Sequence, residues 1–312
     1  MLIKRICALA AVSLALAGCG QAAADDDRPD VLASIYPLQF VAEQVAGELA
    51  VVGSITPVGA EPHDLELAPA QVRGLDGADV VVYVSGFQPA VDDAVAARAV
   101  GTVIDAVDAL GLEPEGEHEH DDDEAHDDAA HDDDAHAGHD HAGDPHFWLD
   151  PQLLAGLADP VADALGELDP DNAATYSANA ARLTAELEEI DAEYAVGLAS
   201  CERSVVVVSH EAYGYLTERF GLTQVGLSGL DPEGEPSPAR LREIRAAIAK
   251  HDVTTVFTES LVNPKAAEVL AADLGLETAL LDPIEAQVDP EADYRDVMRA
   301  NLDALTKALG CA

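Results

Sequence analysis

Four residues in this chain share a position that suits metal binding. His63 and His210 each follow an apolar, valine-containing run, and His146 follows an acidic, histidine-rich stretch. Asp282 ends the apolar segment 277–281. Residues just beyond the carboxyl ends of parallel strands line the ligand crevice of α/β sheets. Three neutral imidazoles and one carboxylate would form a tetrahedral first shell of ligands, with two contributed by each half of the chain.

A single histidine at such a position is more often a hydrogen-bonded structural residue than a ligand, so the argument depends on three of them occurring together. Metal-bound imidazoles also need acceptors that fix their tautomers. Glu259 ends another apolar segment and is the first candidate for this role, and Glu211 is a weaker one. Glu61 and Asp64 flank His63 and could either support it or replace a ligand.

Seven further histidines lie in an acidic stretch that reads EHEHDDDEAHDDAAHDDDAHAGHDH. Residues 113–144 contain 15 acids and no lysine or arginine. The stretch has no apolar periodicity, so we expect a disordered loop that binds divalent cations weakly and in many geometries. A solvated charge run would explain the acids but not the histidines, and the role of the loop in capture, delivery or sensing stays open. The auxiliary metal-binding residues are His118, His120, His126, His131, His136, His139 and His141.

The composition excludes several function classes. The chain has 312 residues and a formal net charge of −44, with 60 acids against 16 bases. Nucleic acids and anionic lipid surfaces both require clustered lysine and arginine, so we expect neither as an electrostatic partner. A hydrophobic fraction of 48% is sufficient for folded cores. Outside the acidic stretch, the excess of acids is most simply explained by solubility or by adaptation to a salty or cation-rich milieu.

The N-terminus has the pattern of a lipoprotein signal. Lys4 and Arg5 precede an apolar run over 6–17, which is too short to span a bilayer and ends in Leu-Ala-Gly-Cys. We therefore predict a signal peptide over 1–18 and an acylated Cys19 that begins a tether over 19–30. An ordinary secretory signal with a chance cysteine is the alternative. The mature chain would be exported and anchored by lipid at the outer face of the cytoplasmic membrane.

Two cysteines remain after processing. Cys201 and Cys311 would lie in an oxidising compartment, where two leftover thiols are expected to form a disulfide. A cysteine metal site is the alternative, but the chain lacks the paired C-x-x-C spacing typical of such sites.

The alternation of short apolar runs with helical segments predicts an α/β fold. We expect two Rossmann-like lobes with mostly parallel sheets, over 31–168 and 201–312, joined by a single long α-helix within 169–200. Asp171 is the predicted N-cap of that helix, which would run about 28 residues, or roughly 42 Å. Apolar residues recur along it at intervals of three and four and mark one buried face, made of Tyr176, Ala180, Leu183, Leu187, Ile190 and Tyr194.

Several motifs, taken together and in order, resemble the metal-binding lipoproteins of ABC-type zinc and manganese importers, most closely the zinc-uptake members. Besides the lipobox, they are PHDLELAPAQVRGLDGADVVVYVSG, DPHFWLDP, SHEAYGYL, FTESLVNPKAAEVLA and LLDP. The resemblance runs from about residue 30 to the C-terminus. It implies that a two-lobed protein carries Zn(II) as transported ligand to an ABC permease membrane subunit powered by a cytoplasmic ATPase. We expect this protein to be a monomer.

The resemblance also implies that His63, His146 and His210 are ligands. Asp282 matches the carboxylate found in many members, although an acid beside the first histidine, or water, fills that place in some zinc members. Manganese members tend to have a carboxylate where His210 stands, and nitrogen-rich four-coordinate sites suit Zn²⁺ better than Mn²⁺. The alternatives are a manganese- or iron-specific member, a metal-dependent surface adhesin and a zinc hydrolase. The sequence lacks the H-E-x-x-H motif typical of many zinc hydrolases, so we expect a protein that is not an enzyme.

Overall fold

The protein is described by a computed structural model that covers residues 28–97, 101–112 and 143–312. Its first lobe contains a four-stranded, fully parallel sheet in the order β2-β1-β3-β4. Apolar, β-branched residues dominate the central strands and are buried, as expected for a parallel sheet covered on both faces. The strands are β1 (Asp30–Ala33), β2 (Val51–Ser54), β3 (Val80–Tyr83) and β4 (Thr102–Asp105).

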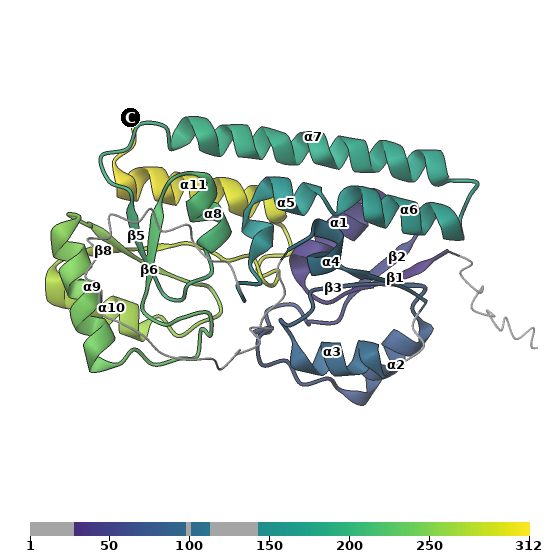
Figure 1. Cartoon of the computed structure of the whole chain (residues 1–312), viewed down its shortest axis with the longest axis horizontal. Coiled ribbons are helices and arrows are strands. Elements are labelled where there is room, and N and C mark those ends of the chain that lie inside the picture. The colour runs from purple at the N-terminus through teal and green to yellow at the C-terminus, as the bar shows by residue number, and fades with distance from the viewer. Residues whose placement is uncertain (1–27, 98–100, 113–142) are drawn as a thin grey trace, which may run out of the picture.

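Helices connect and cover these strands, so the predicted alternation is observed. The first-lobe helices are α1 (Tyr36–Ala46), α2 (Pro69–Gly77), α3 (Pro89–Ala96) and α4 (Ala106–Leu110). Three more helices follow Gly143, where the described chain resumes. They are the short helix η1 (Phe147–Leu149), α5 (Pro151–Ala155) and α6 (Ala158–Leu168). Figure 1 shows α2 and α3 on the opposite side of the first sheet from α1 and α6.

The second lobe repeats this architecture. Its sheet has the order β6-β5-β7-β8 and is also fully parallel. Both sheets therefore reverse strand order beside their first strand, which places the following loops at one edge of each sheet. The elements are β5 (Val205–Val208), α8 (Gly214–Arg219), β6 (Thr223–Gly226), α9 (Pro238–Lys250), β7 (Thr255–Thr258), α10 (Lys265–Leu274), β8 (Glu277–Leu280) and α11 (Tyr294–Leu309).

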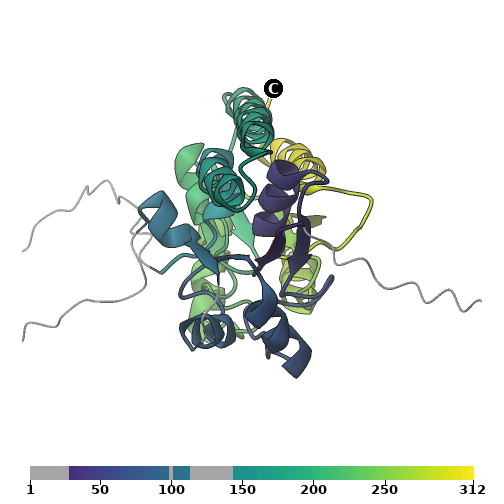
Figure 2. The same ribbon diagram turned by 90° about the vertical axis from the view of Figure 1, so that its right-hand side faces the viewer.

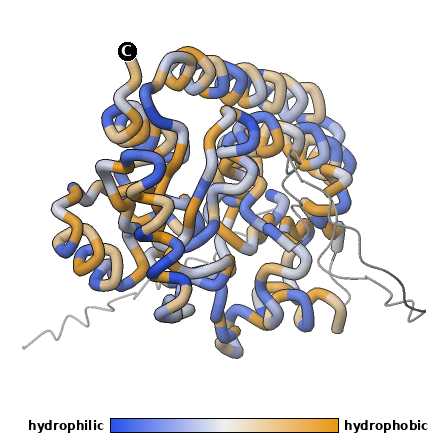
Figure 3. The backbone as a smooth tube through the Cα atoms, turned by 60° about the vertical axis from the view of Figure 1, so that its left-hand side comes forward, coloured by the Kyte–Doolittle hydropathy of each residue, from blue (hydrophilic) through white to orange (hydrophobic). Residues whose placement is uncertain are grey.

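A single long helix, α7 (Ala173–Gly197), joins the lobes and runs along both of them (Figure 1). Its 25 residues correspond to about 37 Å. It packs against α1, α5, α6 and α11, and the end-on view of Figure 2 shows it at the top of the molecule. Hydrophobic and hydrophilic residues alternate along it in Figure 3, and the six residues predicted for its buried face are all fully buried.

The start of α7 differs from the prediction. The helix begins at Ala173 and its N-cap is Asn172, not Asp171. A turn before the helix explains the difference, because Asp169 accepts hydrogen bonds from the Asn172 amide and the Tyr176 hydroxyl. The acceptor that organises this end of the helix therefore lies two residues earlier than the sequence pattern indicated.

The two lobes share a continuous hydrophobic core beneath α7. One buried cluster includes Phe40 and Trp148 from the first lobe together with Tyr213, Tyr294 and Met298 from the second. Tyr294 stacks on Phe40, with 5.3 Å between ring centroids, and donates a hydrogen bond to the Trp148 carbonyl. Smaller clusters lie on the outer side of each sheet. The lobes are therefore packed together along their α7 side.

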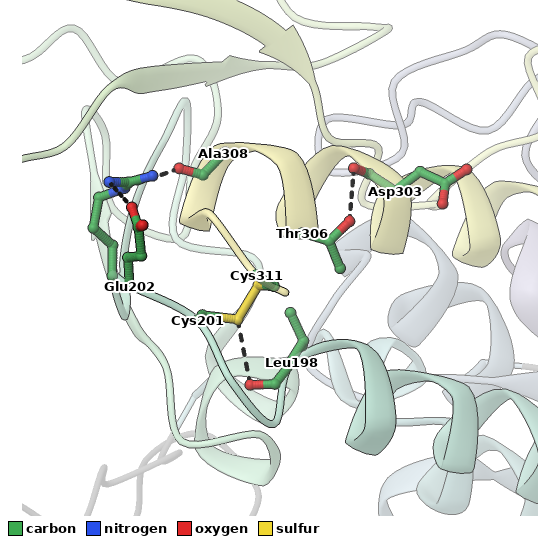
Figure 4. Close-up of a disulfide and its surroundings, with 8 residues drawn as sticks. Leu198, Cys201, Glu202, Asp303, Thr306, Ala308 and Cys311 are labelled. Carbon is green, nitrogen blue, oxygen red and sulfur yellow. Dashed lines mark hydrogen bonds and ion pairs between the residues drawn. A yellow bond between two sulfur atoms is a disulfide. The ribbon is translucent and has the colours of Figure 1, made fainter.

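The predicted disulfide between Cys201 and Cys311 is confirmed (Figure 4). It joins the segment between α7 and β5 to the residue that follows α11, across 110 positions of sequence. The closing helix of the second lobe is thereby linked to the start of the same lobe. Among the residues that the structure describes, no helix has the length and apolar character needed to cross a membrane. The predicted signal peptide and Cys19 lie outside them.

Candidate metal centre

Four side chains converge at the interface between the lobes: His63, His146, His210 and Glu285. Each offers one ligand atom, and these four atoms lie within 4.8 Å of one another. The Glu285 Oε1 atom lies 3.3 Å from His63 Nε2, 3.2 Å from His146 Nε2 and 3.3 Å from His210 Nε2. The same nitrogen of each ring therefore points at one carboxylate oxygen, an arrangement that could enclose a single cation.

The topology of the two sheets explains the convergence. His63 lies in the loop between β2 and α2, and His146 immediately precedes η1. His210 follows β5, where four buried valines end, and Glu285 follows β8. Each lobe thus contributes two side chains, as predicted, and three of the four come from loops that follow the carboxyl ends of parallel strands.

Carboxylates fix the orientation of two of the imidazoles. Glu259 Oε2 lies 2.7 Å from His210 Nδ1, and its Oε1 accepts a hydrogen bond of 3.1 Å from the His210 N–H. Asp144 Oδ1 lies 2.8 Å from His146 Nδ1 and accepts from the His146 N–H at 3.0 Å. An Nδ1–H donated to a carboxylate leaves Nε2 with its lone pair, the form that binds metal.

His63 is held in a different way. Its side chain is 13% exposed, whereas those of His146 and His210 are fully buried. Glu61 accepts hydrogen bonds from the His63 and Asp64 N–H groups, so it shapes the loop rather than contacting the ring. The ring packs edge-on against Phe87, with 4.7 Å between centroids. Within the described chain, no carboxylate lies within hydrogen-bonding distance of His63 Nδ1.

The predicted residues separate into those the structure brings together and those it does not. His63, His146 and His210 meet, and Glu259 contacts His210. Glu211 instead pairs with Arg240 at 2.6 Å and accepts from the Gly226 N–H. The seven histidines between 118 and 141 lie outside the described residues.

The carboxylate in the group is Glu285 and not the predicted Asp282. Asp282 Oδ2 accepts a hydrogen bond from the Ser260 hydroxyl, and its Oδ1 accepts from the Ile284 N–H. Both acids belong to the segment LLDPIE, so the sequence contained the signal but did not rank its two carboxylates. Asp144 was also missed, although it lies only two residues before His146.

The charges in the group favour a bound cation or, in its absence, protonated histidines. Burial disfavours a charged His210, but hydrogen bonds to Glu259 and Glu285 outweigh burial and raise its pKa to about 10. Burial likewise opposes charge on His146, and hydrogen bonds to Asp144 and Glu285 raise its pKa. Burial would raise the pKa of Glu285, but the three imidazoles hold it well below its usual value. In the metal-free protein, protons therefore supply the positive charge that this buried group requires.

These atoms can do one kind of chemistry well. Three imidazole nitrogens and one carboxylate oxygen suit a divalent ion that accepts four-coordination. A neighbouring surface pocket of about 640 Å³ is lined by Glu61 and by residues of α9, α10 and adjoining loops of the second lobe, and it includes none of the three histidines. The four ligand atoms of the centre lie within 4.8 Å of one another, a spacing that suits a single ion and not a larger organic molecule.

Two parallel-sheet lobes on one long helix, with imidazoles from both lobes meeting between them, define a two-lobed metal-binding protein of the solute-binding class. Comparison with known proteins makes the assignment narrower. The chain belongs to the family described as zinc-uptake complex component A, periplasmic, which matches residues 31–308. This is a family of extracytoplasmic transport components and not of enzymes.

Curated relatives agree with the family. The chain is 31% identical to the zinc-binding lipoprotein AdcA of Streptococcus pneumoniae over 98% of its own length, and it spans 60% of that relative. It is also 31% identical to the high-affinity zinc uptake system protein ZnuA of Bacillus subtilis, over 96% of both chains. The chain therefore corresponds to part of the first relative and to nearly all of the second.

Solved structures share the fold. The Zn(II)-bound ZnuA-like domain of Streptococcus pneumoniae AdcA is 27% identical, with a TM-score of 0.71, over 90% of this chain and 99% of that one. The laminin-binding protein Lmb of Streptococcus agalactiae is described as bifunctional, with adhesin and metal transporting activity. It is 31% identical, with a TM-score of 0.75, over 90% of this chain and 99% of its own.

Proposed function

We propose that this protein captures Zn(II) outside the cytoplasm, holds it between its two lobes and delivers it to the membrane permease of an ABC importer. The observation that carries the proposal is the convergence of three Nε2 atoms on one Glu285 oxygen, with two of the rings oriented by carboxylates behind them. Membership of the zinc-uptake family supports the same cargo and the same partner. The zinc ion is the transported substrate and not a resident cofactor.

The ligands of the bound ion are His63, His146, His210 and Glu285. Zinc binding replaces the protons now shared between the imidazoles and the carboxylate, and the ion lies where the four ligand atoms face one another. Glu259 and Asp144 accept hydrogen bonds from Nδ1–H and keep the rings in place as the ion arrives. None of these residues needs to carry out a covalent step, because the function is binding and release.

The donor set favours zinc over manganese. Three nitrogens and one oxygen match the tetrahedral preference of Zn²⁺, whereas Mn²⁺ prefers more oxygen ligands and a higher coordination number. Competition titration with a chromogenic chelator tests this, with one tight zinc per chain and much weaker manganese binding expected. Anomalous scattering at the zinc edge then identifies the ligands. Equal affinity for both ions would contradict the zinc assignment.

The chain is held at the membrane surface by lipid on Cys19. Small residues before this cysteine and the basic, then apolar, segment ahead of it support processing as a lipoprotein. Replacement of Cys19 by Ser should release the protein from the membrane fraction without changing its zinc affinity. Retention of the Ser variant at the membrane would contradict the anchor.

Adhesion is a second candidate function. The likeness to Lmb, which is described as both an adhesin and a metal transporter, is the observation that favours it. Binding of the purified protein to immobilised laminin, measured with and without zinc, would test this role separately from transport.

A further inference from the structure

The segment that carries Glu285 has an unusual backbone. It follows β8 and turns at Ile284, whose φ of +58° lies in the left-handed region. A β-branched residue seldom adopts this conformation because its side chain crowds the adjacent peptide groups. Ile284 is also fully buried, so the turn is not a loose surface feature. Something in the surrounding structure must hold it there.

Asp282 caps the turn with its side chain. Its Oδ1 accepts a hydrogen bond of 2.8 Å from the Ile284 N–H, two residues on, and its Oδ2 accepts one of 2.5 Å from the Ser260 hydroxyl. The buried amide of Asn301, in α11, pairs with both backbone polar groups of Asp282, at 2.9 and 2.7 Å. The position of Asp282 is thus defined by the loop that follows β7 and by α11 of its own lobe.

The rest of the segment is fixed from both lobes. The Tyr213 hydroxyl donates to the Leu281 carbonyl at 2.7 Å, and Trp148 Nε1–H donates to the Pro283 carbonyl at 2.7 Å. The Tyr36 N–H donates to the Glu285 carbonyl at 3.3 Å. At least one backbone polar group of each residue from Leu281 to Glu285 therefore has a hydrogen-bond partner. Of the two carboxylates in the segment, one is used to build the turn and the other is free to face the imidazoles.

We propose that Asp282 is a positioning residue, which fixes the left-handed turn at Ile284 and so presents the Glu285 carboxylate to the three imidazoles. This inference rests on the proposed metal centre, with Glu285 as a ligand. A metal ligand that is already oriented before binding loses less freedom when the ion arrives. The two acids therefore have separate roles: Glu285 contacts the ion, and Asp282 acts only through Glu285.

The first test compares zinc affinities of substituted full-length chains by chelator competition. Asp282→Ala should weaken binding about 10–100-fold, the range typical for residues that orient a ligand. Asp282→Asn keeps an acceptor for the Ile284 N–H and should stay within about threefold of the wild type. Asp289 makes the same local contact, to the Glu291 N–H at 2.9 Å, outside the segment. Asp289→Ala is the matched control and should have wild-type affinity.

A double-mutant cycle with Glu285→Ala decides the mechanism. If Asp282 acts through Glu285, Asp282→Ala should weaken binding by less than about twofold in the Glu285→Ala background. X-ray absorption at the zinc edge should show three imidazoles retained and the carboxylate oxygen lost or replaced in Asp282→Ala. A merely structural role would not alter that oxygen selectively. Should Asp282→Ala not fold, Asp282→Ser, whose hydroxyl is a weaker acceptor, carries the test, with an intermediate loss expected.

Several results would overturn the inference. They are wild-type affinity in Asp282→Ala, an equal loss in Asp282→Asn and Asp282→Ala, and a full additional loss in the Glu285→Ala background. The second of these would indicate that the Asp282 charge itself binds the ion. Failure of the metal centre has a different signature, because Glu285→Ala and His210→Ala would then both retain wild-type zinc affinity.

Discussion

In the first lobe, His63 lies in an open loop with its side chain 13% exposed, whereas in the second lobe His210 is completely buried. The His63 ring packs edge-on against Phe87, whereas the two Glu259 oxygens bond to the backbone N–H and to Nδ1 of His210. The second lobe also supplies Glu285 from a segment that is hydrogen-bonded along its length. Both second-lobe ligands are therefore held by hydrogen bonds to neighbouring groups, whereas in the first lobe only His146 is held in this way and His63 completes the site from the side nearest solvent.

The same contrast extends to the covalent structure. The disulfide found among the described residues joins two segments of the second lobe. Cys201 lies before β5, and Cys311 follows α11. A cross-link over 110 positions restricts the unfolded chain more than a short one does. The lobe in which both ligands are fixed by hydrogen bonds is thus also the lobe whose ends are covalently linked.

Removal of the disulfide should have the largest effect on stability. The Cys201→Ser/Cys311→Ser chain should unfold with a free energy lower by about 4–5 kcal/mol, because the unfolded chain regains the entropy of an open loop. Denaturant titration of the metal-free protein, compared with the wild type under reducing and oxidising conditions, measures the difference. An unchanged midpoint would mean that the packing of α11 alone secures the second lobe.

Replacement of single histidines should show that His210 of the second lobe contributes more to zinc affinity than His63 of the first lobe. His210→Ala removes the imidazole that Glu259 Oε2 and Glu285 Oε1 both face in the buried interior, and it should weaken zinc binding by more than about 100-fold. His63→Ala acts at the exposed edge, where water can fill the vacated position, and should cost only about tenfold. Competition titration measures both, and the exposed His251→Ala is the control. Equal losses for the two variants would remove the distinction between the lobes.

The sequence was sufficient for the architecture and for three of the four converging side chains. The 3.6-residue spacing identified the buried face of α7, and the rule for carboxyl ends of parallel strands located His63 and His210. It could not choose between Asp282 and Glu285, because the choice depends on the turn at Ile284. That turn is stabilised by Asn301 and other residues far away in the sequence, and no local pattern encodes those contacts.

The N-cap of α7 and the partner of His146 were missed for related reasons. Asp171 fits the usual capping pattern, but a turn organised by Asp169 begins the helix at Ala173. Asp144 lies at the edge of the acidic stretch and was assigned to it by composition. Its side chain instead contacts the Nδ1 atom of His146, two residues later in the sequence. Composition describes a segment as a whole and does not show which of its residues belongs to the adjoining fold.

Zinc binding should release protons from the imidazoles of the buried group. The His210 pKa is raised to about 10 from 6.5, so its contribution to the stability of the metal-free protein is complete below pH 6.5 and is lost as the pH rises towards 10. Glu285 has a lowered pKa, and its contribution is lost in acid. Zinc must displace the His210 proton, so zinc affinity should rise with pH through the same window in which the metal-free protein loses stability.

Calorimetry in buffers of different ionisation enthalpy measures this release. About one proton or more per zinc is expected at pH 7 for the wild type. Fewer are expected for Glu259→Gln, because a neutral amide replaces the carboxylate whose hydrogen bond to His210 raises the His210 pKa. Glu211→Gln is the matched control, since Glu211 pairs with Arg240 instead. Zinc affinity that stays constant from pH 6 to 9 would contradict an imidazole-dominated centre in which His210 is protonated before zinc arrives.

Deletion of residues 117–141 should have the smallest effect. All four converging side chains and the carboxylates that orient them lie outside that stretch, so the affinity of the tight site should stay within about twofold of the wild type. Weak additional zinc binding should disappear, because seven of the eleven histidines are removed. Titration with excess zinc distinguishes the two classes of site. A large loss of tight affinity would mean that the position of His146 in the first lobe depends on the acidic stretch. The contrast between the buried, hydrogen-bonded ligands of the second lobe and the more exposed His63 of the first lobe would then depend on residues beyond the converging group.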